Sequence, residues 1–140
     1  MKLFLDTNVL IDFILERPKF YPAAATIISF AAEGKVKVCV SSMSIVTTNF
    51  ICVERCNMPL ADFCKKMDFL RDFLEIGSVD DSDIYYSYDK GWKDFEDGVQ
   101  YHSAQRNEAD YLVTRNTKDF EENDLNVIDV DEACSLLMLN

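Results

Sequence analysis

Short apolar runs alternate with longer segments of helical periodicity along the chain. Runs such as residues 2–5 and 36–40 are typical of strands that are buried on both faces of a sheet. Between such runs, apolar residues recur at three- and four-residue spacing, most clearly at Leu60, Phe63 and Met67. This spacing is that of an amphipathic helix. The pattern therefore predicts strands that alternate with helices.

The predicted elements extend over the whole chain. We predict strands at residues 2–5, 36–40, 75–79, 111–114 and 126–128. We predict helices at residues 8–15, 21–33, 44–55, 59–74, 82–88, 94–106 and 131–139. Alternation of this kind favours parallel strands, right-handed crossovers and helices on both faces of the sheet. The sequence thus predicts a three-layer α/β/α fold with a central, mainly parallel sheet of about five strands.

Length and composition are those of one globular domain. A chain of 140 residues with 49% hydrophobic and 28% charged residues is near the average for such domains. We therefore expect a single domain over residues 1–140. The apolar run before Asp6 is too short for a signal peptide, and no later stretch approaches the length of a membrane span. We expect no membrane association and a cytoplasmic location.

The net charge of -11 narrows the range of functions. Binding to a phosphate backbone usually draws on Lys and Arg, so this charge argues against a tight DNA-binding module. It is compatible with an enzyme whose acidic residues are neutralised by bound cations. The five cysteines form no C-x-x-C pair, which argues against a structural zinc site and against a disulfide framework.

Acidic residues follow the predicted strands. Asp6 comes directly after the first strand, and Asp119 lies in the loop after the fourth. Ligands of open α/β sheets bind beyond the carboxyl ends of the strands, so both acids are candidates for a site. Asp6 is equally well placed to cap the helix that begins near Asn8, a role that stabilises a helix by about 1 kcal/mol.

A further acidic group, Asp94, Glu96 and Asp97, lies at the start of a predicted helix. Its simplest interpretation is a solvated first turn that favours the helix dipole. Asp97, however, shares a helix face with Tyr101, and the adjacent Gly98 permits close approach of the backbone. We therefore expect Asp97 to point inward.

Carboxylates that converge need a positive charge between them. Two carboxylates about 4 Å apart repel by about 4 kcal/mol at an effective dielectric constant of about 20. Neither Asp6 nor Asp97 is adjacent to a basic residue, and a set of oxygen ligands suits Mg²⁺ or Mn²⁺ better than zinc. The implied chemistry is metal-assisted hydrolysis of a phosphate ester.

Three segments together resemble the PIN domain, a family of metal-dependent ribonucleases that includes the toxins of many bacterial toxin–antitoxin pairs. The segments are FLDTNVLIDF at residues 4–13, DFEDGVQYHSA at residues 94–104 and DYLVTRNTKDF at residues 110–120. Their order and spacing match the family, and the predicted elements agree with it over essentially the whole chain.

The resemblance implies which residues bind the metal and which lie beside the RNA. The implied catalytic residues are Asp6, Asp97 and Asp119. The implied metal ligands are these three together with Asn116 and Asp94. The residues expected beside the substrate are Asn8 and Thr114, from the resemblance, and Arg115 and Lys118, from their place in the loop next to the proposed metal.

One feature of the family is missing. PIN domains usually have a glutamate early in the helix after the second strand, where this chain has no acid at residues 44–49. Glu54 follows about two turns later, and Thr47, Thr48 or Asn49 could hold a metal-bound water instead. A PIN fold with weak or no activity that binds RNA or a partner is therefore an alternative function.

A phosphoacceptor receiver domain is a second alternative, because it is also a small α/β domain with acids at strand ends. In that case Asp80 or Asp81 would accept the phosphoryl group.

His102 is the single histidine, has no evident carboxylate partner in the sequence, and is expected to be a packing residue. The aromatic residues between Tyr85 and Phe95 are interpreted either as RNA-stacking groups or as a core edge or dimer surface.

The resemblance also implies binding partners. RNA is the expected substrate, and an acidic metal pocket invites a small antitoxin protein that inserts Arg or Lys side chains. Homodimers are frequent in the family, and the apolar residues 136–139 could contribute to such an interface.

Overall fold

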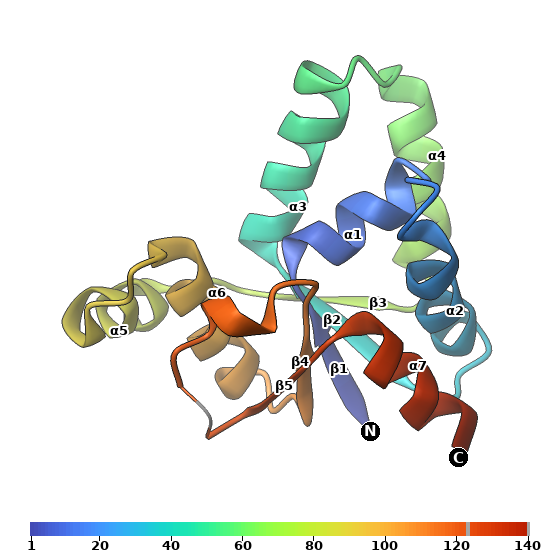
Figure 1. Cartoon of the computed structure of the whole chain (residues 1–140). Helices are drawn as coiled ribbons and strands as arrows, with labels where there is room; N and C mark the ends of the chain where they lie inside the picture. Colours follow the sequence, from blue (N-terminus) through green and yellow to red (C-terminus); the bar gives the residue numbers. More distant parts are fainter. Residues whose placement is uncertain (123, 140) are drawn as a thin grey trace.

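Five parallel strands form the centre of the computed structural model, which describes residues 1–122 and 124–139. The strands lie in the order β3-β2-β1-β4-β5 (Figure 1). Each neighbouring pair is parallel. The strands are β1 (Lys2–Leu5), β2 (Lys37–Ser41), β3 (Leu74–Gly77), β4 (Tyr111–Val113) and β5 (Asn126–Ile128).

Helices connect the strands and cover both faces of the sheet. The α-helices are α1 (Thr7–Ile14), α2 (Tyr21–Ala32), α3 (Ser42–Asn49), α4 (Leu60–Arg71), α5 (Asp81–Lys90), α6 (Phe95–Arg106) and α7 (Val130–Leu139). A π-helix, η1 (Phe50–Arg55), continues α3, and a short 3₁₀ helix, η2 (Thr117–Asp119), follows β4. Within the described ranges, no helix combines the length and the apolar character needed to cross a membrane.

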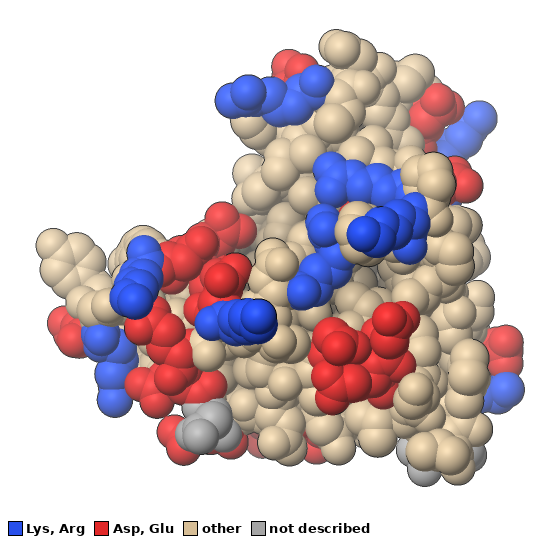
Figure 2. Space-filling view, viewed as in Figure 1, with Lys and Arg blue, Asp and Glu red and all other residues tan. Residues whose placement is uncertain are grey.

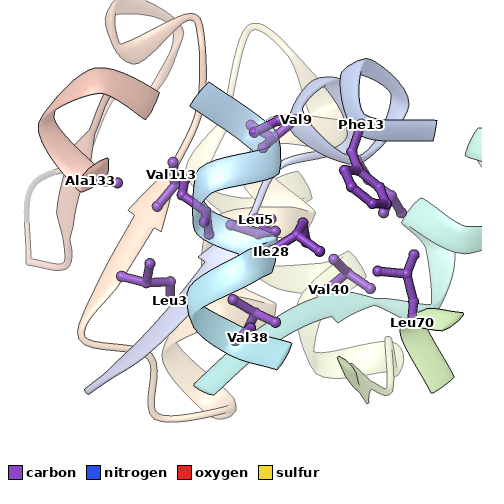
Figure 3. Packing of buried hydrophobic residues seen from close by; sticks show 14 of the residues in the cluster. Leu3, Leu5, Val9, Phe13, Ile28, Val38, Val40, Leu70, Val113 and Ala133 are labelled. Carbon is purple, nitrogen blue, oxygen red and sulfur yellow. The ribbon is translucent and has the colours of Figure 1, made fainter. Parts of the chain in front are cut away.

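The larger part of the core lies on one face of the sheet. Leu3 and Leu5 of β1 point to this face because alternate residues of a strand project to the same side. There they pack with Val38 of β2 and Val113 of β4 against residues of α1, α2, α4 and α7 (Figure 3). These four helices form one outer layer.

The opposite face of the sheet carries a smaller core. Phe4 projects to this side, between Leu3 and Leu5, and packs with Leu112 against Tyr101 and Ala104 of α6. Trp92, just before α6, completes the cluster. The two cores with the sheet between them confirm the predicted three-layer α/β/α fold.

The strand order reverses direction at β1. β1 pairs with β2 on one side and with β4 on the other, so the crossovers leave β1 in opposite directions. Ligands of such sheets bind where the order reverses, outside the carboxyl ends of the strands. Receiver domains have the order 2-1-3-4-5, which differs from the order found here. The receiver-domain alternative is therefore excluded.

Most predicted elements differ from the observed ones by one to three residues at an end, as in α4, which ends at Arg71 so that Leu74 begins β3. Two further differences have a clear local cause. The helix predicted at residues 44–55 begins earlier, because the Ser41 side chain caps it at the backbone N–H of Ser44, and its second half is the π-helix η1. The strand predicted at residues 75–79 ends at Gly77. Beyond it, Arg106 donates to the carbonyl of Ser78, and the N–H of Val79 donates to the Ser42 hydroxyl.

Gly98 allows α5 and the segment before α6 to pack closely against α6. A β-carbon at this position would lie 2.7 Å from the Trp92 ring and even closer to the Ser87 hydroxyl. We predict that Gly98→Ala destabilises the fold by about 1–3 kcal/mol through overpacking, although alanine favours a helix. Urea denaturation measures this change. Ser29→Ala, at an exposed position of α2, is the control and should be nearly neutral; equal stability of both variants would contradict the packing argument.

Candidate active site

Asp6 lies where β1 passes into α1 and caps this helix, which is one of the two roles that the sequence left open. Its Oδ1 atom caps α1 by accepting a hydrogen bond of 2.8 Å from the backbone N–H of Thr7. Its Oδ2 atom accepts a 2.7 Å hydrogen bond from the hydroxyl of Thr114, directly after β4. The carboxylate is therefore fixed between two adjacent strand ends, with only 6% of the residue exposed.

Asn8 and Thr114 hold the Asp6 carboxylate and its surroundings in place. The Asn8 amide lies 3.4 Å from Asp6 Oδ2 and 3.5 Å from Thr114 Oγ1. The backbone N–H of Asn116 donates to Thr114 Oγ1 at 3.1 Å. The predicted residues Asn8 and Thr114 thus lie beside Asp6, where they orient its carboxylate.

Asp97 reaches the same region from α6, whose first turn is capped by Asp94. The Asp94 Oδ1 atom accepts a hydrogen bond of 3.1 Å from the Asp97 backbone N–H. Burial, which is the largest cause, and the nearby charges of Asp6, Asp94 and Asp119 together raise the pKa of Asp97 to about 7. The charges of acids from three separate parts of the chain therefore act on Asp97.

The same repulsion acts on Asp6. Burial is the main cause that raises its pKa, and the charges of Asp94 and Asp119 add to it. The hydrogen bonds from Thr114 and Thr7 oppose this increase because they stabilise the ionised carboxylate. Burial and the neighbouring acids thus disfavour the charge of Asp6, and the two hydrogen bonds offset part of this effect.

This set of donors fits a hard divalent cation. Carboxylate and amide oxygens are the ligands preferred by Mg²⁺ and Mn²⁺, and an ion would remove the repulsion among them. In the described part of the chain, no three Asp, Glu, His or Cys side chains are already grouped closely enough to hold an ion. Asp94, Asn116 and Asp119 are exposed, and Asp94 also caps α6.

A buried layer of hydroxyl and amide groups lies next to Asp6, where α3 lacks the family glutamate. The Thr7 and Ser44 hydroxyls are 2.7 Å apart, and the Gln100 side-chain amide donates to both of them, at 2.9 and 2.6 Å. Thr48 is fully buried, and its hydroxyl has no hydrogen-bond partner among the described residues. Glu54 is exposed, two turns away on η1.

Glu96 is a member of the acidic group that the sequence analysis did not assign to the site. The Thr7 hydroxyl lies 3.5 Å from its Oε1 atom. Glu96 is exposed as a whole residue, but partial burial of its carboxyl raises its pKa, as do the charges of Asp6 and then Asp94. The signal available in the sequence was the spacing of four residues between Glu96 and Gln100, because positions i and i+4 share one helix face.

Arg115 is engaged by groups beside the site. Its Nε atom lies 2.8 Å from an oxygen of buried Asp12, and its guanidinium stacks 4.0 Å from the ring centre of Phe20. Together with Lys19 and Asn116 it lines a cavity of about 420 Å³. Figure 2 shows a group of Lys and Arg side chains near the centre of this face, close to groups of Asp and Glu.

Lys118 lies in η2, between Asn116 and Asp119, with its side chain exposed. The structure therefore places this predicted basic residue in the same turn as two proposed metal ligands. It makes no ion pair with the described residues that would hold it away from a substrate phosphate.

The expectation that His102 lacks a carboxylate partner is wrong. Its Nδ1 atom lies 2.7 Å from Oδ1 of Asp83, and its ring stacks on Tyr86 at 4.5 Å between centres. Asp83 is fully buried and also accepts hydrogen bonds from Arg106. The sequence did not show this contact because the partner is in another helix. His102 thus belongs to a network that fastens α5 to α6.

The aromatic residues near α5 divide into two groups. Tyr86 and Trp92 pack against Tyr101, which confirms the core interpretation for these two. Tyr85 and Tyr88 are 62% and 77% exposed and contribute little to the core.

Comparison with known proteins identifies the family. The model of the PIN domain family matches residues 2–118, so the chain belongs to the PIN domain family. This match confirms the resemblance noted in the sequence. A protein named ribonuclease VapC1, from Aquifex aeolicus, is 26% identical over 135 residues that cover 95% of this chain and 93% of that protein.

Two solved structures are similar in fold. VapBC2 from Rickettsia felis, bound to a DNA fragment from its promoter, contains a chain that aligns with a TM-score of 0.69 and 20% identity, covering 92% of this chain and 98% of that one. A toxin–antitoxin complex from Klebsiella pneumoniae aligns with a TM-score of 0.65 and 20% identity, covering 91% and 97%.

The raised pKa of Asp97 predicts how stability depends on pH. The folded protein holds this proton more tightly than the unfolded chain, whose carboxyl has a pKa of 3.8. The free energy of unfolding therefore falls as the pH rises from about 4 to about 7. In EDTA, the melting temperature should fall by several degrees between about pH 5 and about pH 8.

Two variants separate this effect from general charge repulsion. Asp97→Asn should show a smaller fall, because the amide does not titrate, whereas Asp68→Asn, at an exposed position of α4, should behave like the unmodified protein. An equal fall in Asp97→Asn would contradict the assignment.

Proposed function

We propose that this PIN domain is a metal-dependent endoribonuclease that hydrolyses RNA phosphodiester bonds with Mg²⁺ or Mn²⁺. The observation that carries the proposal is the placement of Asp97, whose pKa is raised to about 7 by burial and by the nearby charges of Asp6, Asp94 and Asp119. Such a cluster is unfavourable without a cation. The name of the Aquifex relative, a ribonuclease, supports RNA as the substrate.

Some residues of the site would bind the metal, and others would position these metal ligands. Asp6, Asp97 and Asp119 would bind the ion, with Asp94 and Asn116 as further ligands. The bound ion supplies activation of the attacking water and neutralisation of charge on the phosphate. Thr114 fixes the Asp6 carboxylate by its 2.7 Å hydrogen bond, and such supporting contacts typically change metal affinity by about 10–100-fold.

Basic residues beside the acids would guide the RNA backbone. Lys118 is exposed within the turn that carries Asp119, and Arg115 and Lys19 line the adjoining cavity. Asp129 and Asp131 line the same cavity, so a phosphate is drawn toward the side that carries Lys19 and Arg115. Because the net charge is -11, we expect RNA to bind weakly when no divalent ion is present.

RNA cleavage tests the proposal. Asp6→Asn and Asp97→Asn keep the size of each side chain and remove its charge, so each should reduce Mn²⁺-dependent cleavage at least about 100-fold, which corresponds to a loss of about 3 kcal/mol in transition-state stabilisation. Gel analysis of a labelled structured RNA, with EDTA and Asp68→Asn as controls, measures this. If Asp6→Asn and Asp97→Asn cleave the RNA as fast as the unmodified protein, the activity lies elsewhere.

A PIN fold with weak or no activity, acting as a binding module, is the alternative function. The absence of the α3 glutamate favours it, because Thr7, Ser44 and Gln100 fill that region. RNA that binds without being cut in Mn²⁺ would establish this alternative.

An antitoxin partner is part of the proposal. The Rickettsia and Klebsiella structures are toxin–antitoxin complexes, and an acidic pocket suits a partner segment that inserts Arg or Lys. We predict that the protein purified from its native host carries a small protein with a basic segment, and that this partner inhibits cleavage. Mass spectrometry of the purified complex identifies it; a protein that is isolated alone and fully active would contradict this prediction.

A homodimer and a cytoplasmic location complete the proposal. Met138 and Leu139 are 66% and 84% exposed at the end of α7, whereas Leu137 belongs to the core. These two exposed side chains are available for a dimer interface. Analytical ultracentrifugation would detect the dimer.

A further inference from the structure

The loss of the family glutamate from α3 leaves one wall of the metal site without an acid. Ser44 and Thr48, both fully buried, point from this helix into the protein interior. Neither side chain has a charge to offer a cation. A carboxylate that completes the site must therefore come from another element.

Glu96 approaches the same place from α6. It precedes Asp97, and its Oε1 atom lies 3.5 Å from the hydroxyl of Thr7, the residue that follows Asp6. Gln100, one turn further along α6, donates to the same Thr7 hydroxyl at 2.9 Å. One face of α6 thus brings Glu96 and Gln100 together onto the start of α1.

The buried hydroxyl groups form a chain of hydrogen-bond donors that ends at Glu96. Ser41 Oγ lies 3.2 Å from Ser44 Oγ, which is 2.7 Å from Thr7 Oγ1. Each hydroxyl has one proton to donate. Among the described residues, the contacts satisfy all three protons only when Ser41 donates to Ser44, Ser44 donates to Thr7, and Thr7 donates to Glu96.

The Gln100 amide reinforces this order of donors. Its Nε2 group donates to both Thr7 and Ser44, so neither oxygen needs a proton from the other groups to be satisfied. Hydrogen bonds in such a chain polarise one another in the same direction. The chain ends on a carboxylate, a group that only accepts when ionised. The network therefore directs a hydrogen-bond donor at the Glu96 carboxylate beside the start of α1.

We propose that Glu96 is the carboxylate that replaces the missing α3 glutamate, so that α6 supplies two acids to the metal site and the chain Ser41–Ser44–Thr7 positions one of them. The proposal rests on the metal-dependent function proposed above. It assigns Glu96 as a metal ligand and Thr7 as a positioning residue.

Binding of Mn²⁺, measured by calorimetry without RNA, tests the proposal. Glu96→Gln should weaken Mn²⁺ binding at least about tenfold, because it removes a ligand charge while keeping the shape of the side chain. Thr7→Val should weaken binding by a smaller factor, since it removes only the donor. Glu54→Gln is the matched control, because Glu54 is exposed on η1 and is the other glutamate near the gap, and it should bind as the unmodified protein does.

Each outcome is decisive. Melting temperatures in EDTA first establish that the variants are folded, and Glu96→Gln should melt at or above the temperature of the unmodified protein because it relieves repulsion. Unchanged Mn²⁺ binding by Glu96→Gln, or a loss in Glu54→Gln of the same size, overturns the assignment and leaves the proposed function intact. Failure of the unmodified protein to bind Mn²⁺ overturns both.

Discussion

Repulsion among carboxylates at the ends of β1 and β4 is the constraint to which the rest of the site responds. Asp6 is buried between the two strand ends, where burial and the charges of Asp94 and Asp119 oppose its ionisation. Hydrogen bonds from Thr7 and Thr114 stabilise its charged form. The fold therefore holds together acids that would separate in water, and a divalent cation is the group that relieves this cost.

The surrounding helices are arranged so that this repulsion is maintained. Gly98 lets the segment around Trp92 and Ser87 pack closely against α6, next to Asp97. On the far side of α6, the buried Asp83 joins His102 and Arg106, which fastens α5 to it. These contacts keep the first turn of α6, with its acids, against the start of α1. Structural stability and the charge of the site are thus opposed, as is common at functional sites.

The sequence predicted the parts of the molecule that depend on local pattern. The alternation of Leu3, Phe4 and Leu5 between two cores follows from strand geometry, and Asp6 follows from its place after β1. The sequence did not reveal the role of Glu96, because its contact with Thr7 joins residues 89 positions apart. The stacking of Arg115 on Phe20 was hidden for the same reason. Pairings of this kind depend on how helices pack, which no local pattern specifies.

Proton release on metal binding tests the central claim, that the converging acids form a cation site, most directly. At about pH 6, Asp97 is largely protonated in the metal-free protein, because its pKa is about 7, and a bound ion must displace that proton. Calorimetric titration with Mn²⁺ in buffers of different ionisation enthalpy measures the number of protons released. We predict release of most of one proton per bound ion, and much less in Asp97→Asn. Binding without proton release, or equal release by both proteins, would contradict the account.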